Sequence, residues 1–182
     1  MPLLALCLHA LSLLVGGVPC QEAPAQPAPQ ILAEPAELEY NLELPLTFVG
    51  AAAEGQAVVR FDEQDSGDGL ELQATRSELA LIQVAGGVAT PLAGPTPLRP
   101  DESGSATVTL RRRQDRVSVL IGPKCVLTAW REATSGKLSL SATEGLLNPD
   151  AVYYQPYAPP EFTDNFMRGE EDPTGEWQVV EG

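Results

Sequence analysis

Basic residues and histidine are scarce in this sequence of 182 residues. It contains 11 lysine and arginine residues against 25 aspartate and glutamate residues, and its formal net charge is −14. Nucleic acids and anionic membrane surfaces attract proteins through an excess of lysine and arginine. The composition therefore argues against nucleic acid as a partner. The apolar content of 43% is enough to fill the core of one domain.

Charged residues are absent from the first 18 positions. The apolar run at 3–18, LLALCLHALSLLVGGV, is shorter than the roughly 20 residues of a membrane span but fits the apolar region of a secretory signal. Ala23 and Ala25 form a small-x-small cleavage site, and Cys20 marks an alternative site. We therefore predict a signal peptide at 1–25 and export to the medium, the periplasm or the cell envelope. Only an uncleaved signal would attach the chain to a membrane.

Cysteine and histidine become scarcer still after cleavage, because Cys7, Cys20 and His9 lie within the signal. Without histidine, the mature chain has no Ser-His-Asp triad, no Cys-His dyad and no histidine-ligated zinc site. The remaining cysteine, Cys125, cannot form a disulfide within the chain, and its apolar neighbours in KCVLTAW predict a buried, inert thiol. We assign no catalytic, cofactor-binding or metal-ligating residues in this sequence.

Helical periodicity is also missing, and short segments of alternating polar and apolar residues replace it from residue 36 onward. This pattern predicts an all-β fold, an antiparallel two-sheet jelly-roll sandwich over 36–158. Proline-rich residues 26–35 are predicted to form a linker, and the four prolines in 91–100 predict a loop. The predicted strands are 37–44, 56–62, 69–75, 78–84, 105–113, 116–122, 125–130, 137–143 and 150–157.

Alternate side chains on each predicted strand are expected to face the core of such a sandwich. This rule selects ten apolar positions, two on each of five predicted strands. The expected buried residues are Leu70, Leu72, Leu79, Leu81, Val108, Leu110, Val117, Val119, Leu138 and Leu140.

The composition changes again in the last segment, 159–182. Residues 161–182 carry seven acidic residues and one arginine, together with Phe162, Phe166 and Trp177. A purely solvated acidic tail would be poor in aromatic residues. We therefore expect a partly ordered tail that docks on a neighbouring surface, or the start of a second module.

Three stretches between 38 and 157 carry a family resemblance: AVVRFDEQDSGDGLELQAT, ELALIQVAGGVATPLAG and VTLRRRQDRVSVLIGPKCVLTAWREATSGKLSLSAT. They resemble the concanavalin A-like lectin/glucanase superfamily, in its laminin-G-like and 3-keto-disaccharide-hydrolase-like bacterial branch. The tail EFTDNFMRGEEDPTGEWQVVEG is similar to the opening strand of a jelly-roll module in secreted bacterial proteins. The resemblance implies a jelly roll with a concave face in a secreted protein that binds or cleaves glycans.

The catalytic carboxylates of the glucanase branch are not reproduced. Those enzymes carry Glu-x-Asp-x-(x)-Glu on one strand, which places the acids on one face. Here Glu63, Gln64 and Asp65 begin in the same way, but Ser66 and Gly67 follow and indicate a turn. The resemblance therefore does not imply catalysis.

Three aspartates around two glycines form the one candidate for a bound cation. Asp62, Asp65 and Asp68 recur every third residue, and such oxygen-rich loops can hold calcium. The spacing of an EF-hand is missing, however, and acidic glycine turns are common. We favour a solvated turn over a calcium site.

Arginines cluster at 111–116, where Arg111, Arg112, Arg113 and Arg116 could clamp a carboxylate or a sugar acid. Strand alternation directs Arg111 and Arg113 to one face and Arg112 to the other. Because the four residues do not form one patch, we favour a solvated strand edge, where such charges also discourage edge pairing.

Aromatic residues offer a further candidate, because the faces of sugar rings stack on aromatic rings. Trp130, Tyr153, Tyr154 and Tyr157 are the available side chains. We expect Trp130 in the core, as is usual for aromatics on sandwich strands. Tyr153 and Tyr154 must point in opposite directions, and the role of the tyrosines stays open.

These observations favour an exported, non-catalytic β-sandwich module that binds carbohydrate or a cell-surface partner. Two alternatives stay open. One is a glycoside hydrolase with an atypical carboxylate pair, and the other is a structural or interaction domain of a larger envelope protein.

Overall fold

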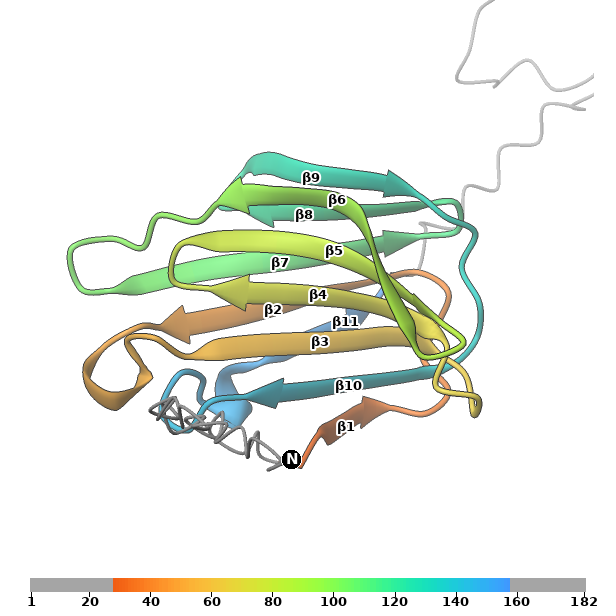
Figure 1. The fold of residues 1–182 in the computed structure, drawn as a ribbon, viewed down its shortest axis with the longest axis horizontal. Helices are drawn as coiled ribbons and strands as arrows, with labels where there is room; N and C mark the ends of the chain where they lie inside the picture. The colour runs from red at the N-terminus through yellow and green to blue at the C-terminus, as the bar shows by residue number, and fades with distance from the viewer. Residues whose placement is uncertain (1–27, 158–182) are drawn as a thin grey trace, which may run out of the picture.

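The computed structural model describes residues 28–157, which form a sandwich of two antiparallel β-sheets (Figure 1). Sheet A has six strands in the order β1 (Gln30–Ala33), β10 (Lys137–Ala142), β3 (Gln56–Glu63), β4 (Gly69–Thr75), β5 (Glu78–Ala85) and β6 (Val88–Pro97). Sheet B has five strands in the order β11 (Tyr153–Pro156), β2 (Tyr40–Thr47), β7 (Ser105–Arg113), β8 (Arg116–Ile121) and β9 (Lys124–Trp130). The helical turns in this part of the chain are two short 3-10 segments, Gly50–Ala52 and Pro149–Ala151. The predicted all-β sandwich is confirmed.

The core lies between the two sheets and follows the alternation of the sequence. All ten positions that we expected to be buried are at most 7% exposed. Tyr40, Phe48 and Phe61 add the large rings of this core, and each is at most 1% exposed. Since successive side chains of a strand point to opposite faces, the same alternation sends the polar residues of each strand outward.

Two edge strands of sheet A lie where the sequence predicts no strand. β6 occupies most of the proline-rich segment 91–100, and β1 occupies part of the predicted linker 26–35. The loop prediction for 91–100 was wrong because β6 pairs only with β5, and an edge strand, which does not need all of its N–H groups, tolerates proline. The linker prediction was wrong at β1, which pairs only with β10, because its four residues, QILA, contain no proline and the prolines of 26–35 lie on either side of them.

One buried ion pair joins the two sheets. Arg112 on β7 is fully buried, and its Nη2 lies 2.7 Å from Oδ2 of Asp62 on β3. The Nε atom of Arg112 donates to the same carboxylate oxygen at 3.1 Å, and Nη1 donates to the backbone carbonyls of Arg113 and Arg131. The expectation of a solvated arginine edge was therefore wrong for Arg112, because its partner comes from the other sheet.

The partner carboxylate, Asp62, is itself constrained. Its backbone has a φ of 54°, a left-handed conformation that aspartate tolerates better than most residues. Burial raises the pKa of Asp62, and the hydrogen bonds and charge of Arg112 oppose this effect. The ion pair thus holds a carboxylate in a place that disfavours its charge.

Two predicted segments lie outside the described residues, namely the signal peptide at 1–25 and the acidic tail at 159–182. Between residues 28 and 157 there is no helix long and apolar enough to cross a membrane.

Candidate functional site

The outer face of sheet A carries a row of polar side chains across its central strands. The strand register places Ser139 on β10, Arg60 on β3, Glu71 on β4 and Ile82 on β5 side by side. The outward positions follow from alternation, because Val59, Phe61, Leu70 and Leu72 beside them point into the core. We call Arg60, Glu71, Gln73 and Gln56 the polar ladder.

The polar ladder is held together by hydrogen bonds between its own side chains. Arg60 Nε donates to Glu71 Oε1 at 2.9 Å, and Gln73 Nε2 donates to Glu71 Oε2 at 3.0 Å. Gln56 Nε2 extends the ladder to Gln73 Oε1 at 3.4 Å. Glu71 is therefore only 7% exposed, although it stands on an outer face.

The Arg60 side chain is 53% exposed, and within residues 28–157 its two terminal amino groups have no hydrogen-bond partner. The ladder thus presents preoriented donors, namely guanidinium and amide N–H groups, above a fixed carboxylate. Small and aliphatic side chains surround them, including Val58, Ile82 and Ser141.

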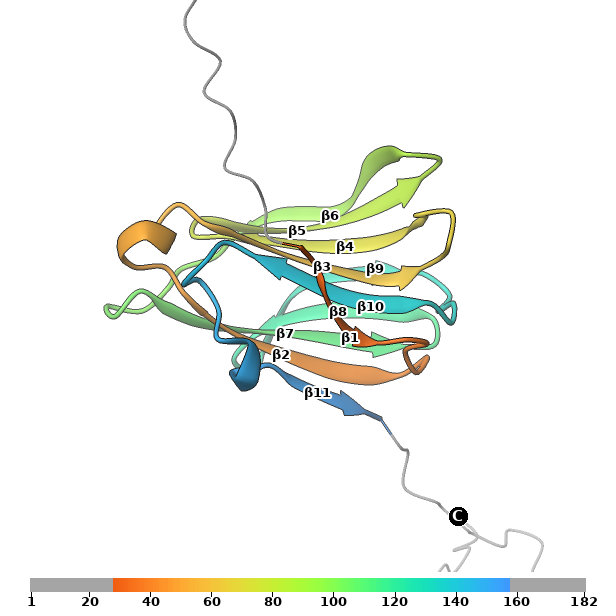
Figure 2. The same cartoon turned by 90° about the horizontal axis from the view of Figure 1, so that it is seen from below.

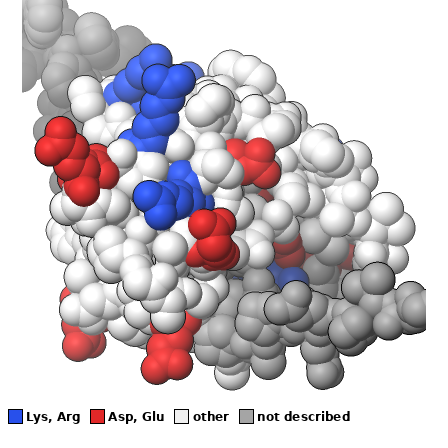
Figure 3. All heavy atoms as spheres, turned by 60° about the vertical axis from the view of Figure 1, so that its left-hand side comes forward, with Lys and Arg blue, Asp and Glu red and all other residues white. Residues whose placement is uncertain are grey.

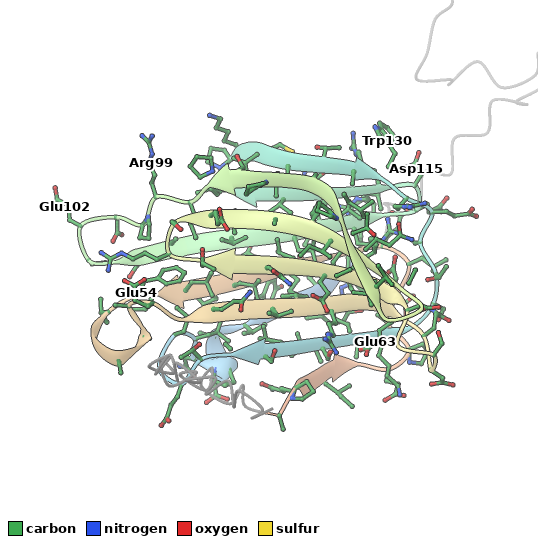
Figure 4. The ribbon with its side chains drawn as sticks, viewed as in Figure 1. Glu54, Glu63, Arg99, Glu102, Asp115 and Trp130 are labelled. Atoms are coloured by element: carbon green, nitrogen blue, oxygen red, sulfur yellow. The ribbon has the colours of Figure 1, made fainter. Side chains whose placement is uncertain are left out.

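The β5–β6 hairpin borders the polar ladder on one side. In Figure 2 the end of this hairpin rises above the rest of sheet A. Arg60, Glu63, Glu71 and Val84 line a shallow hollow at this place. Glu63, labelled in Figure 4, accepts a long hydrogen bond of 3.5 Å from Ser139 Oγ.

The three aspartates of the candidate calcium loop point to different partners. Asp62 faces Arg112 between the sheets. The Asp65 side chain is fully exposed with its Oδ1 3.6 Å from Lys137 Nζ, and Asp68 Oδ1 accepts from the Gly86 backbone N–H at 2.7 Å. Among the described residues there is no group of three or more histidine, cysteine, aspartate or glutamate side chains that could hold a metal ion.

Larger hollows lie at the two ends of the sandwich. One of about 560 Å³ is lined by Glu54, Arg76, Leu98 and Arg99 among others, and it lies at the end where Figure 4 labels Glu54 and Arg99. Basic and acidic side chains are interspersed when the molecule is turned to bring this end forward (Figure 3). The second hollow, of about 300 Å³, lies at the opposite end and includes Asp62, Asp68 and Arg131.

The aromatic candidates lie on sheet B, far from the polar ladder. Trp130 is 68% exposed, so its predicted place in the core was wrong. Leu127 and Ala129 point inward on β9, and Trp130 therefore points outward with Thr128. The polar Thr128 two residues earlier was the signal in the sequence that could have revealed this.

The tyrosines divide between the interior and the surface. Tyr153 is 54% exposed, whereas Tyr154 packs against Tyr40 with ring centroids 5.4 Å apart. The two side chains point in opposite directions, as expected. Tyr157 is 41% exposed and lies beneath the Arg113 guanidinium, whose carbon is 4.0 Å from the ring centroid.

Cys125 is exposed, and the prediction of a buried thiol was wrong. The register between β8 and β9 shifts at this point, because Val119 pairs with Leu127 but Leu120 pairs with Cys125. The irregularity places one extra residue, Val126, on β9 and sends Cys125 to the outer face. The thiol lies 3.3 Å from Thr128 Oγ1.

No family of known proteins matches the sequence, and no curated protein matches it. Solved structures do match the fold. The carbohydrate-binding module CBM66 from Bacillus subtilis has a TM-score of 0.51 at 16% identity, covering 65% of this chain and 76% of its own. Sheep galectin-11 in complex with glycerol has a TM-score of 0.52 at 10% identity, covering 72% of this chain and 99% of its own. A human galectin-16 variant gives the same score and identity, covering 72% and 96%.

At these identities the likeness concerns the arrangement of the strands. The described residues therefore share the two-sheet sandwich fold of a carbohydrate-binding module and of galectins, and this fold fits the resemblance of the sequence to the concanavalin A-like lectins.

Proposed function

We propose that this chain is an exported, non-catalytic β-sandwich module that binds carbohydrate on the outer face of sheet A. The polar ladder is the observation that carries this proposal. Sugar hydroxyl groups both donate and accept hydrogen bonds, and the ladder offers guanidinium, amide and carboxylate groups in one fixed row. Because these side chains already hold one another in place, a ligand would order few of them on binding.

The shape of the face is consistent with an extended ligand. The ladder crosses the strands of an open sheet, and the β5–β6 hairpin supplies a raised border on one side (Figure 2). The fold adds support, because one of the structures that share it is by name a carbohydrate-binding module.

A glycoside hydrolase is the second candidate, and one observation favours it. Glu63 and Glu71 line the same shallow hollow, and hydrolases use a pair of carboxyl groups. Both oxygens of Glu71, however, already accept hydrogen bonds from Arg60 and Gln73. A carboxylate held in this way suits recognition better than attack on a sugar carbon, and we therefore favour binding.

The test is affinity electrophoresis of the chain against a panel of neutral and acidic polysaccharides, followed by titration calorimetry with the best oligosaccharide. We expect Arg60→Ala and Gln73→Ala each to weaken binding by about tenfold, which corresponds to about 1.4 kcal/mol. Arg76→Ala is the matched control, since this arginine lies in the hollow at one end of the sandwich. Equal binding by all three variants, or no binding at millimolar sugar, would contradict the proposal.

The same preparation separates the two candidates. A binding module releases no reducing sugar from any polysaccharide that it binds. Release of sugar that is lost in both Glu63→Gln and Glu71→Gln would establish the hydrolase instead. Binding of a cell-surface protein with no affinity for any glycan would favour an interaction domain of a larger envelope protein.

Export is the remaining part of the proposal and rests on the apolar run at 3–18. Cleavage after Ala25 gives a mature chain that begins at Gln26. The N-terminal sequence of protein recovered from the culture medium or the cell envelope checks this directly, and a chain retaining Met1 in the cytoplasm would contradict it.

A further inference from the structure

The outer face of sheet B has a chemistry different from that of sheet A. The register brings together Arg113 on β7, Arg116 on β8 and Trp130 on β9, while Tyr157 lies next to β2 through its N–H, which donates to the Glu39 carbonyl. We call Tyr157, Arg113, Arg116 and Trp130 the arginine–aromatic row. Arg111 occupies the next outward position on β7.

Within the described residues the arginines of this face are not held in ion pairs, although the charge of Glu39 acts on Arg113. None of the four ion pairs among the described residues involves Arg111, Arg113 or Arg116. Arg113 and Arg116 instead lie over the rings of Tyr157 and Trp130, at 4.0 and 5.6 Å from the ring centroids. Burial and the nearby positive charge of Arg111 lower the pKa of Arg113. A face with unpaired arginines and exposed rings is suited to a partner that is both acidic and aromatic.

Such a segment belongs to the same chain. Residues 161–182 carry seven acidic residues, one arginine, two phenylalanines and Trp177. β11 is the last strand of the described chain (Figure 2), and Tyr157, the residue that directly follows it, is itself a member of the row. The acidic segment therefore begins four residues from the surface whose charge it complements.

We propose that residues 161–182 dock on the arginine–aromatic row of their own chain. The reach is sufficient. From β11 to β9 the sheet spans four strand spacings of about 4.8 Å, or roughly 19 Å. At about 3.3 Å per extended residue, Glu161 lies within roughly 13 Å of Tyr157 and Asp164 within roughly 23 Å. The first two acids can thus reach Arg113 and Arg116, and the aromatic residues after them, Phe166 and Trp177, can reach Trp130.

This docking is independent of the glycan site proposed on sheet A, because the two surfaces lie on opposite sides of the sandwich. It would cover the exposed rings of sheet B. A failure to bind glycan would therefore not contradict the docking of residues 161–182.

Cys125 provides a probe on the same face as the row. In the full chain with Cys7→Ser and Cys20→Ser, a nitroxide on Cys125 should broaden the amide signals of residues 161–182 in NMR spectra. The broadening should disappear in 1 M salt, where the Debye length is about 3 Å. The same signals in a chain with a diamagnetic label provide the reference.

Charge reversal identifies the surface. The double variant Arg111→Glu with Arg116→Glu should abolish the broadening, and it preserves the hydrogen bonds of Arg113 to Tyr40 and Asn41. The matched control, Arg76→Glu with Arg99→Glu, changes the charge equally at the end hollow and should retain the broadening. Adding Glu161→Lys and Asp164→Lys to the first pair should restore it.

Four outcomes would overturn the proposal. The first is an absence of broadening in the unaltered chain, and the second is broadening that persists in Arg111→Glu with Arg116→Glu. The third is broadening that passes from a labelled copy to an isotope-labelled one, which would identify a second copy as the occupant. The last is an acidic polysaccharide that binds the row without changing the signals of 161–182, which would identify a glycan surface instead.

Discussion

The two outer faces of the sandwich use arginine in opposite ways. On sheet A, Arg60 meets the carboxylate of Glu71 at 2.9 Å, and the charge is balanced within the face. On sheet B, Arg113 and Arg116 lie over aromatic rings, and Arg111 has no ion-pair partner in the described part of the chain. The ion pair on sheet A neutralises the arginine and fixes its hydrogen-bonding groups. The ring contacts on sheet B do not neutralise the arginines, whose positive charge can still attract an acidic ligand. Sheet A is thus suited to a neutral polar ligand and sheet B to an acidic one.

The interior pair that joins these faces should give the largest effect. We expect Asp62→Ala to lower the free energy of unfolding by about 3–5 kcal/mol, because it leaves the Arg112 charge buried without a carboxylate. Urea unfolding followed by circular dichroism measures this. Asp65→Ala is the control, since that side chain is fully exposed and should change nothing measurable.

Replacing both partners tests whether the loss of stability comes from the unpaired charge of Arg112. Burial raises the pKa of Asp62, so the carboxylate gains little from its position. The combination Asp62→Leu with Arg112→Met should therefore recover the part of the lost stability that comes from the unpaired charge, while leucine, like alanine, is strained at the φ of 54°. A double variant as unstable as the single one would show that packing around the side chains matters more than their charges.

A second prediction compares the two faces directly. Glu71→Ala should cost about 1–2 kcal/mol, because it removes an acceptor shared by Arg60, which is half exposed, and Gln73. Arg111→Ala on sheet B should cost less than about 0.5 kcal/mol, as expected for an exposed residue without a bonded partner. Equal losses in thermal unfolding would remove the distinction between a paired and an unpaired face.

The smallest expected effect comes from a substitution in the loop 98–104, which connects β6 of sheet A to β7 of sheet B and belongs to neither outer face. Hydrogen bonds from the Ser103 hydroxyl and the Ser105 backbone lower the pKa of Asp101 below 3.8. A lowered pKa means that Asp101 stabilises the fold above pH 3.8 and that this contribution is lost as the pH falls through the lowered pKa. Asp101→Asn should therefore be slightly less stable than the unaltered chain at neutral pH, and the difference should vanish in acid. A stability difference between the two proteins that grows in acid would contradict the predicted direction of the pH dependence.

Much of the fold follows from alternation in the sequence. Leu110, Val117 and Leu138 could be placed in the core because each stands between polar neighbours on a strand of ordinary composition. The same rule failed where one residue changed the register. The extra residue at Val126 turned Cys125 outward, and no local pattern announces such a bulge.

Long-range partners limited the prediction of the site. Alternation correctly separated Arg112 from Arg111 and Arg113, but burial of Arg112 depends on Asp62, 50 positions earlier in the chain. The polar ladder was missed for a similar reason. Arg60, Glu71 and Gln73 look like ordinary outward residues in the sequence, and only the register of β3 and β4 brings them together.

The prolines of β6 have a consequence for how copies of this molecule behave together. An open strand edge can recruit a strand from another chain and start a growing assembly. β6 is such an edge, but Pro91, Pro95 and Pro97 leave three of its ten residues without an N–H to offer. With a formal charge of −14 on each chain as well, copies crowded on one surface repel each other, and the β6 edge offers no continuous row of N–H groups along which they could polymerise. The residues that concealed this strand in the sequence thus protect the protein against aggregation.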